Sequence, residues 1–111
     1  MSSASLVPID VDVPPQDRLR PLWDCPRLVT PEETRLVAAR LGLGWQQVGR
    51  ELQFSQAALD QFQQDTRSHT EAIQRMLFRW TQWKDHKATV KRLTRALFLH
   101  KEYAAIQVLR P

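Results

Sequence analysis

The chain has 111 residues, of which 42% are hydrophobic and 25% are charged, values that are ordinary for a globular domain. This length suffices for one small domain and excludes a dinucleotide-binding or barrel enzyme. No apolar run approaches the roughly 20 residues that cross a bilayer, so we expect no membrane span. The N-terminus has neither a basic region nor an apolar core region, so we expect no signal peptide there. The single cysteine, Cys25, cannot form an internal disulfide, which favours a reducing compartment such as the cytoplasm.

Charge is distributed unevenly along the sequence. The net charge is +4, but residues 1–66 carry a net charge of −3 and residues 67–111 carry +7. An acidic first half and a basic second half favour docking between complementary protein faces. The same pattern is also compatible with a polyanion bound on the basic half.

Residues 1–29 differ in composition from the rest of the chain. Proline biases the preceding residue towards extended backbone and lacks an N–H donor. This segment holds five of the seven prolines, namely Pro8, Pro14, Pro15, Pro21 and Pro26. We therefore predict an extended or disordered tail over 1–29 and a folded domain over 30–111. Apolar residues alternate imperfectly with Asp10 and Asp12, a pattern that fits either a strand added to a partner's sheet or a solvated linker.

Helix signals begin at Thr30. Thr30 and Glu33 form a predicted capping box with Pro31 at the first helical position, which indicates a helix from 31 to about 41. Gly42 and Gly44 follow it and favour a left-handed stop. A second helix is expected over about 45–52.

Four further helices follow in the pattern. Ser55 is a predicted N-cap, and Ser68 with Glu71 forms a second predicted capping box. Later helices are expected to start near 88–90 and to cover about 102–109, giving an all-α antiparallel bundle. The predicted core comprises Val37, Leu41, Trp45, Val48, Leu52, Leu59, Phe62, Ile73, Leu77, Trp80, Val90, Leu93 and Leu97.

Several of these motifs, in this order, resemble a death domain. Residues 36–45 resemble the end of that family's first helix, and 45–52 resemble its second helix with a buried tryptophan. The apolar stripe ending at Trp80 and the passage through Ala88 to Leu93 resemble its fourth and fifth helices. The resemblance covers about 30–110 and is nearest to the ankyrins, the p53-induced death-domain protein and the netrin receptors. Gly49 stands where many members have alanine, and we expect only a small packing difference there.

The resemblance implies a six-helix antiparallel Greek-key bundle that binds other death domains. It further implies an adaptor in apoptotic or inflammatory signalling, with self-association as an additional expectation, and neither catalysis nor a cofactor. In the family, helices 1 and 4 meet helices 2 and 3 of a neighbour, and the end of helix 4 meets the helix 5–6 corner. Carried over by position, the predicted interface residues are Arg75, Phe78, Arg79, Trp83, Lys84, Asp85, Glu51, Asp60, Asp65, Lys101 and Glu102.

Two features leave alternatives open. Phe78 and Trp83 lie beside the inward stripe of their helix, so they are either exposed interface anchors or covered by the N-terminal segment through Leu22 and Trp23. The basic residues of the fourth and fifth helices form either a solvated face, a docking surface for an acidic partner, or a site for nucleic acid or anionic lipid. A small basic nucleic-acid-binding domain that uses these helices is the alternative function.

Metal binding and catalysis have no support in the sequence. The three histidines, His69, His86 and His100, are not spaced as metal ligands relative to one another or to Cys25. The sequence has no phosphate-binding glycine loop. We therefore expect no metal, no cofactor and no enzymatic activity.

Overall fold

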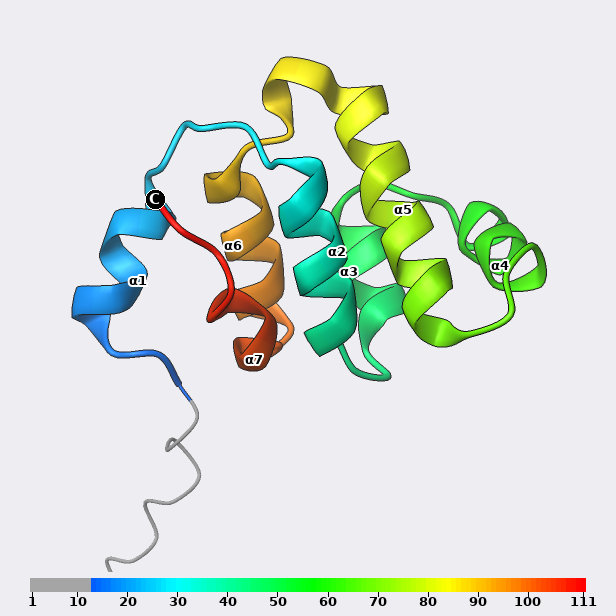
Figure 1. The fold of residues 1–111 in the computed structure, drawn as a ribbon, viewed down its shortest axis with the longest axis horizontal. Coiled ribbons are helices and arrows are strands. Elements are labelled where there is room, and N and C mark those ends of the chain that lie inside the picture. Colours follow the sequence, from blue (N-terminus) through cyan, green and yellow to red (C-terminus); the bar gives the residue numbers. More distant parts are fainter. Residues whose placement is uncertain (1–12) are drawn as a thin grey trace, which may run out of the picture.

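The computed structural model describes residues 13–111, and this part of the chain is all-helical apart from one isolated bridge between Leu28 and Thr89 (Figure 1). The segment around Asp10 and Asp12, predicted either to add a strand or to be a linker, lies outside the described residues. The helices are α1 (Gln16–Trp23), α2 (Pro31–Arg40), α3 (Trp45–Glu51), α4 (Gln56–Gln64), α5 (His69–Lys84), the 3-10 turn η2 (Asp85–Lys87), α6 (Val90–Leu99) and α7 (Tyr103–Ile106).

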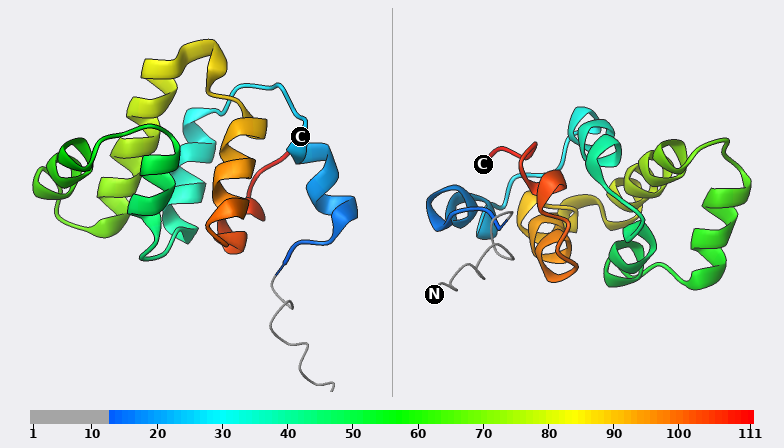
Figure 2. Two further views of the ribbon diagram at one scale, coloured as in Figure 1. Left: turned by 180° about the vertical axis from the view of Figure 1, so that it is seen from behind. Right: turned by 90° about the horizontal axis from the view of Figure 1, so that it is seen from below.

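Helices α2 to α7 are the six-helix bundle expected from the sequence, and α1 is an additional helix. Helix α2 packs against α5 and α7, while α1 packs against α6. Helix α4 projects at one end of the long axis and α1 lies at the opposite end, as both views show (Figures 1 and 2). Helix α7 is shorter than the expected 102–109.

The two interior tryptophans are at the centre of the core. Trp45 and Trp80 expose only 2% and 1% of their surfaces. Every other predicted core residue is also buried, except Phe62, which is only partly buried. Phe62 differs because it lies on the projecting helix α4, where it packs edge-on against Phe54 at a ring distance of 5.5 Å.

An extended tail is wrong for Gln16–Trp23, which forms helix α1. Pro15 is the N-cap of this helix, a position where the missing proline N–H costs nothing, because the first turn of a helix has no internal partner for it. Leu19 and Leu22 share one face, and Leu22 is fully buried. Packing of this face outweighs the unfavourable Pro21 inside the helix.

Some of the predicted helix caps are present in the structure and others are not. The Thr30–Glu33 capping box is confirmed, and Ser55 and Ser68 are N-caps as predicted. Glu71, however, accepts a hydrogen bond from the Arg67 N–H (3.0 Å) instead of closing a second box. The left-handed stop at Gly42 and Gly44 is wrong: neither glycine has positive φ. Instead, the Gly42 N–H donates to the Glu102 carboxylate (3.2 Å), which ties the α2–α3 turn to the start of α7.

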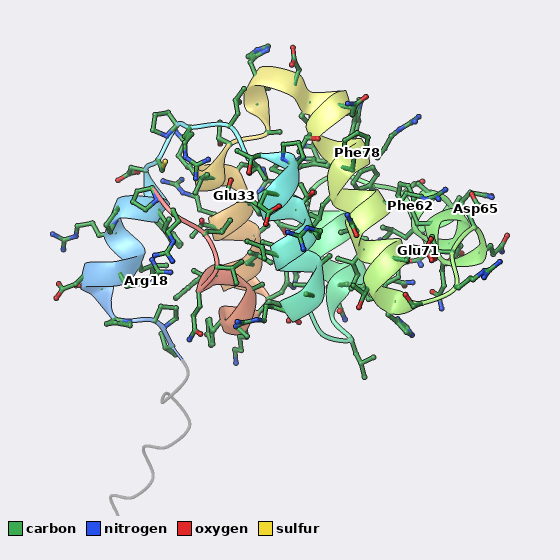
Figure 3. All side chains as sticks on the ribbon, viewed as in Figure 1. Arg18, Glu33, Phe62, Asp65, Glu71 and Phe78 are labelled. Carbon is green, nitrogen blue, oxygen red and sulfur yellow. The ribbon has the colours of Figure 1, made fainter. Side chains whose placement is uncertain are left out.

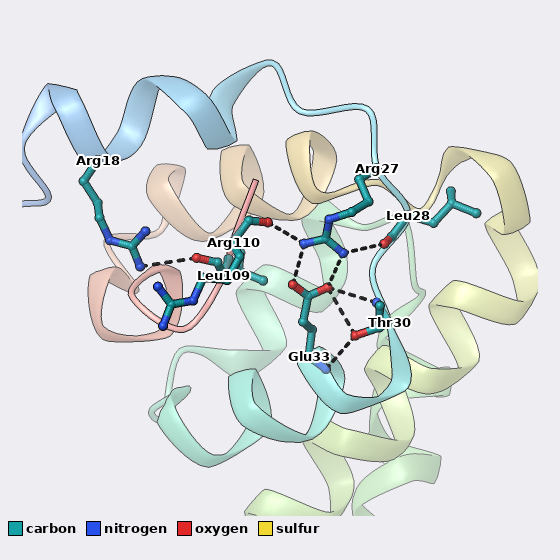
Figure 4. A network of polar contacts seen from close by, with 7 residues as sticks. All are labelled: Arg18, Arg27, Leu28, Thr30, Glu33, Leu109 and Arg110. Atoms are coloured by element: carbon teal, nitrogen blue, oxygen red, sulfur yellow. Dashed lines mark hydrogen bonds and ion pairs between the residues drawn. The ribbon is translucent and has the colours of Figure 1, made fainter.

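An ion pair between Arg27 and Glu33 joins the linker before α2, and the C-terminal segment, to helix α2 (Figure 4). The Arg27 guanidinium donates to both Glu33 oxygens, at 3.0 and 2.6 Å, and also to the Arg110 carbonyl. Glu33 accepts in addition from the Thr30 N–H (3.0 Å). From α1, Arg18 donates to the Leu109 carbonyl (3.2 Å). The residues before α2 are thus fixed to the C-terminal segment.

The linker between α1 and α2 caps the N-terminus of α6. The Arg27 carbonyl accepts from the Val90 N–H (2.8 Å), and the Cys25 carbonyl accepts from the Lys91 N–H (3.0 Å). Both donors belong to the first turn of α6, where N–H groups have no partner within the helix. The linker therefore satisfies polar groups of the bundle.

The surroundings of Glu33 lower its pKa. Burial of this carboxylate raises the pKa, but hydrogen bonds from Arg27 and Thr30 and the positive charge of Arg27 outweigh burial, so the pKa falls below its ordinary value of 4.5. A lowered pKa means that ionised Glu33 stabilises the fold above pH 4.5. This stabilisation is lost as the pH falls through the lowered pKa.

We expect Glu33→Gln to reduce the free energy of unfolding at pH 7 by about 1–3 kcal/mol, because Arg27 loses its charged acceptor. The difference from the wild type should shrink as the pH falls below 4.5. Urea unfolding followed by circular dichroism at a series of pH values measures both effects. The exposed neighbour Glu32, changed to Gln, is the control and should cause little change. A deficit for Glu33→Gln that stayed constant down to pH 2 would contradict this account.

Gly49 of α3 lies in close contact with side chains of α4 and α5. A Cβ at this position would lie 2.6 Å from Leu59 Cδ2 and 2.7 Å from Met76 Sδ, both on fully buried side chains. Alanine at this position would require the flexible ends of these two side chains to shift, so the expectation of a small packing difference here stays a prediction.

We expect Gly49→Ala to lower the free energy of unfolding by about 1 kcal/mol, since overpacking outweighs the gain in helix propensity. At Gly42 an added Cβ would lie 3.8 Å from the nearest Glu102 oxygen, an ordinary contact. Gly42→Ala is therefore the control and should change stability by less than about 0.5 kcal/mol. Thermal and urea denaturation measure both variants, and a stabilised Gly49→Ala protein would refute the packing argument.

Candidate docking surface

An open groove of about 840 Å³ lies between α4 and α5. Phe54 and Phe62 contribute to its lining, together with Phe78 and Trp83 from α5. Figure 3 shows Phe62 and Asp65 on α4 and Phe78 on the neighbouring helix α5. The groove is thus an aromatic concavity at the end of the molecule where α4 projects.

The amphipathic pattern of α5 explains why its aromatic residues are exposed. The buried face of this helix carries Ile73, Leu77 and Trp80, which pack into the core. Phe78 and Trp83 lie outside that stripe and expose 46% and 51% of their surfaces. Large exposed aromatic residues that line a concavity are typical of protein interaction sites.

Aromatic contacts fix the shape of the groove. The ring of Phe54 lies 5.5 Å from that of Phe62 and 5.4 Å from that of Trp83, so it connects α4 with α5. Lys84 Nζ lies 4.0 Å from the Trp83 ring centre, and the same ammonium donates to the Gln53 side chain. Sequence reasoning missed Phe54, although an apolar residue just before the Ser55 N-cap was an available signal.

The two walls of the groove differ in charge. Arg75 and Arg79 line the α5 wall, four residues apart on one helix face. Neither guanidinium has an ion-pair partner among residues 13–111. Asp65 lines the α4 wall, where it accepts a hydrogen bond from the Gln61 side chain (3.0 Å). The groove can therefore orient a charged ligand.

Other predicted interface residues lie outside the groove. Asp60 is exposed on α4 and accepts from the Gln56 side chain (3.0 Å). Glu51, at the end of α3, lies 3.9 Å from Arg92 and 3.6 Å from His100 Nε2, so it already has partners within the chain.

The remaining predicted residues flank two turns. Asp85 and Lys101 have φ angles of 49° and 59° at the ends of α5 and α6. The Glu102 carboxylate accepts the hydrogen bond from the Gly42 N–H. The structure thus brings Arg75, Arg79 and Asp65 into one groove with the aromatic residues, and Lys84 lies over the Trp83 ring beside it. The other predicted residues do not line the groove.

The N-terminal segment, from Val13 onward, does not cover the groove. Trp23 packs edge-on against Phe98 of α6 at a ring distance of 5.4 Å. Arg95 of α6 forms an ion pair with Asp24 (3.1 Å). Residues 13–29 therefore leave Phe78 exposed, which is the first of the two alternatives for this residue.

Within residues 13–111, no three His, Cys, Asp or Glu residues are placed to hold a metal ion. No helix there is both long and apolar enough to cross a membrane.

The described residues form a six-helix bundle, α2 to α7, preceded by the extra helix α1. The family model of the death domain matches residues 33–111, more than half of the chain, and the chain belongs to the death-domain family. Death domains are interaction modules that bind other death-fold domains in apoptotic and inflammatory signalling. Comparison with curated proteins and with solved structures gave no match.

Burial separates the two tryptophans of α5 and predicts different substitution costs. We expect Trp80→Ala to lower the free energy of unfolding by about 3–5 kcal/mol, because it opens a cavity in the core. Trp83→Ala should cost only about 1 kcal/mol, from lost contacts with Phe54 and Lys84. Urea unfolding measures both values, and equal costs for the two variants would contradict the assignment of Trp83 to the surface.

Proposed function

We propose that this chain is a cytoplasmic adaptor that docks onto other death domains through complementary charged surfaces. The observation that carries the proposal is the pair of exposed arginines on α5, Arg75 and Arg79, which have no ion-pair partner in the described part of the chain. Asp60 on α4 supplies an exposed carboxylate on a separate face. A basic face and an acidic face on one molecule favour contacts between unlike surfaces of neighbours.

The positions in the family guide the assignment of the two faces. Helices α2 and α5 correspond to family helices 1 and 4, and α3 and α4 correspond to helices 2 and 3. The first contact then places Arg75 and Arg79 against Asp60 of a neighbour, with Glu51 at its margin. The second contact places Lys84 and Asp85 against the α6–α7 corner, which carries Lys101 and Glu102.

The signalling pathway and the similarity to particular death domains are part of the same proposal. The adaptor would act in apoptotic or inflammatory signalling. Its particular sequence similarity to the death domains of ankyrins, the p53-induced death-domain protein and netrin receptors stays a prediction. Nucleic-acid binding is the alternative hypothesis. The ion pairs of Arg92 with Glu51 and of Arg95 with Asp24 weaken it, because they engage part of the basic surface that phosphates would need.

Charge reversal tests the first contact. We expect Arg79→Glu and Asp60→Arg each to weaken binding to purified death domains, or self-association, by at least about tenfold, because each reversal places like charges together. If the chain self-associates, mixing the two variants should restore association, since each retains the surface that the other lacks. Sedimentation velocity and biolayer interferometry provide the measurements.

Gln107→Glu, an exposed change at the end of α7 and outside the α4–α5 groove, is the control and should bind like the wild type. Full binding by both charge-reversed variants would refute the proposed electrostatic contact.

A further inference from the structure

The α4–α5 groove has a chemistry that selects its occupant. Its lining combines aromatic rings with Arg75 and Arg79 on one wall. A complementary ligand carries apolar side chains for the rings and carboxylates for the guanidinium groups. Asp65 on the opposite wall repels carboxylates, so it favours the orientation in which they face α5. The groove thus fits a short acidic and apolar segment.

This chain contains such a segment outside the described residues. Residues 6–12 combine four aliphatic side chains with two carboxylates, in the order Leu6, Val7, Pro8, Ile9, Asp10, Val11 and Asp12. The segment has no basic residue, so nothing in it repels the arginines of the groove.

The length of the segment indicates which copy of the chain it can reach. Leu6 precedes Val13 by seven residues, so the two lie at most about 25 Å apart. The chain enters α1 at the end of the molecule opposite α4, along a long axis of 51 Å (Figures 1 and 2). The segment is too short to lie in the groove of its own copy.

We propose that the α4–α5 groove binds residues 6–12 of a second copy of this chain. The aliphatic side chains contact Phe62, Phe78 and Trp83, and Asp10 and Asp12 pair with Arg75 and Arg79. Segment and groove are different surfaces, so the contact is heterologous and each bound copy offers a free groove or a free segment to the next. This contact goes beyond the proposed function, since a linear segment rather than a folded face is bound, and the two contacts compete for Arg75 and Arg79.

A labelled peptide tests the binding step. Fluorescence anisotropy of a fluorescein-labelled peptide of residues 1–15 is measured against the full chain. We expect saturable binding that weakens at least about tenfold when Asp10 and Asp12 of the peptide are both changed to Lys. Arg75→Glu in the full chain should weaken it similarly, and Asp65→Asn should strengthen it by removing repulsion. Equal binding of both peptides, or no binding at all, overturns the proposal.

Mixing variants of the full chain tests the head-to-tail geometry. The segment variant carries Asp10→Lys and Asp12→Lys, and the groove variant carries Arg75→Glu and Phe78→Ala. Both affect exposed or N-terminal positions, and circular dichroism verifies their folding. In sedimentation velocity we expect each variant alone to be less associated than the wild type, and the mixture to form a 1:1 dimer that grows no further.

Other occupants give distinguishable results. If the groove variant loses association while the segment variant keeps it, the groove binds a different surface and the proposal is wrong. Asp60→Arg lies outside the groove, so it should leave peptide binding unchanged while weakening docking between folded death domains. The docking function and the segment contact can therefore fail independently.

Discussion

The ion pair between Arg27 and Glu33 determines how the linker before α2 and the C-terminal segment are arranged on the bundle. Glu33 is a buried carboxylate, exposed to only 7%, and such a group is stable only when hydrogen bonds and an opposite charge replace its water. Arg27 and the Thr30 N–H supply them. Because Arg27 also binds the Arg110 carbonyl, one charged pair fixes the linker, the start of α2 and the C-terminal segment together.

The position of the linker determines which surfaces stay exposed. Once Arg27 is fixed, the carbonyls of Cys25 and Arg27 cap α6, and α1 lies along α6 instead of α5. Trp23 then packs against Phe98 of α6, and not against Phe78 of α5. The groove between α4 and α5 is therefore left uncovered by residues 13–29, and its aromatic residues remain available to a partner.

Local signals predicted most of the helices, and long-range contacts account for what they missed. The Thr30–Glu33 box and the apolar stripe ending at Trp80 act within a few residues, so the sequence displays them directly. Helix α1 escaped prediction because its prolines dominate the local pattern, whereas its stability comes from Leu22 packing on α6. The helix face of Phe78 left open whether this residue is exposed or covered by the N-terminal segment, and the groove also needs Phe54, whose loop position has no periodic signal.

The net charge of a segment is a poor guide to the docking face. A better guide is whether each basic side chain already has an ion-pair partner within the chain. Residues 67–111 carry a net charge of +7, yet Arg92 and Arg95 of that half are held by Glu51 and Asp24. A cation that already has a partner adds little to the attraction of another molecule, because binding must first break the internal pair. Arg75 and Arg79 have no such partner in the described part of the chain, and they line the same groove as the exposed rings. Attraction and apolar contact therefore coincide on α5, which is why the proposed docking surface is centred on this helix.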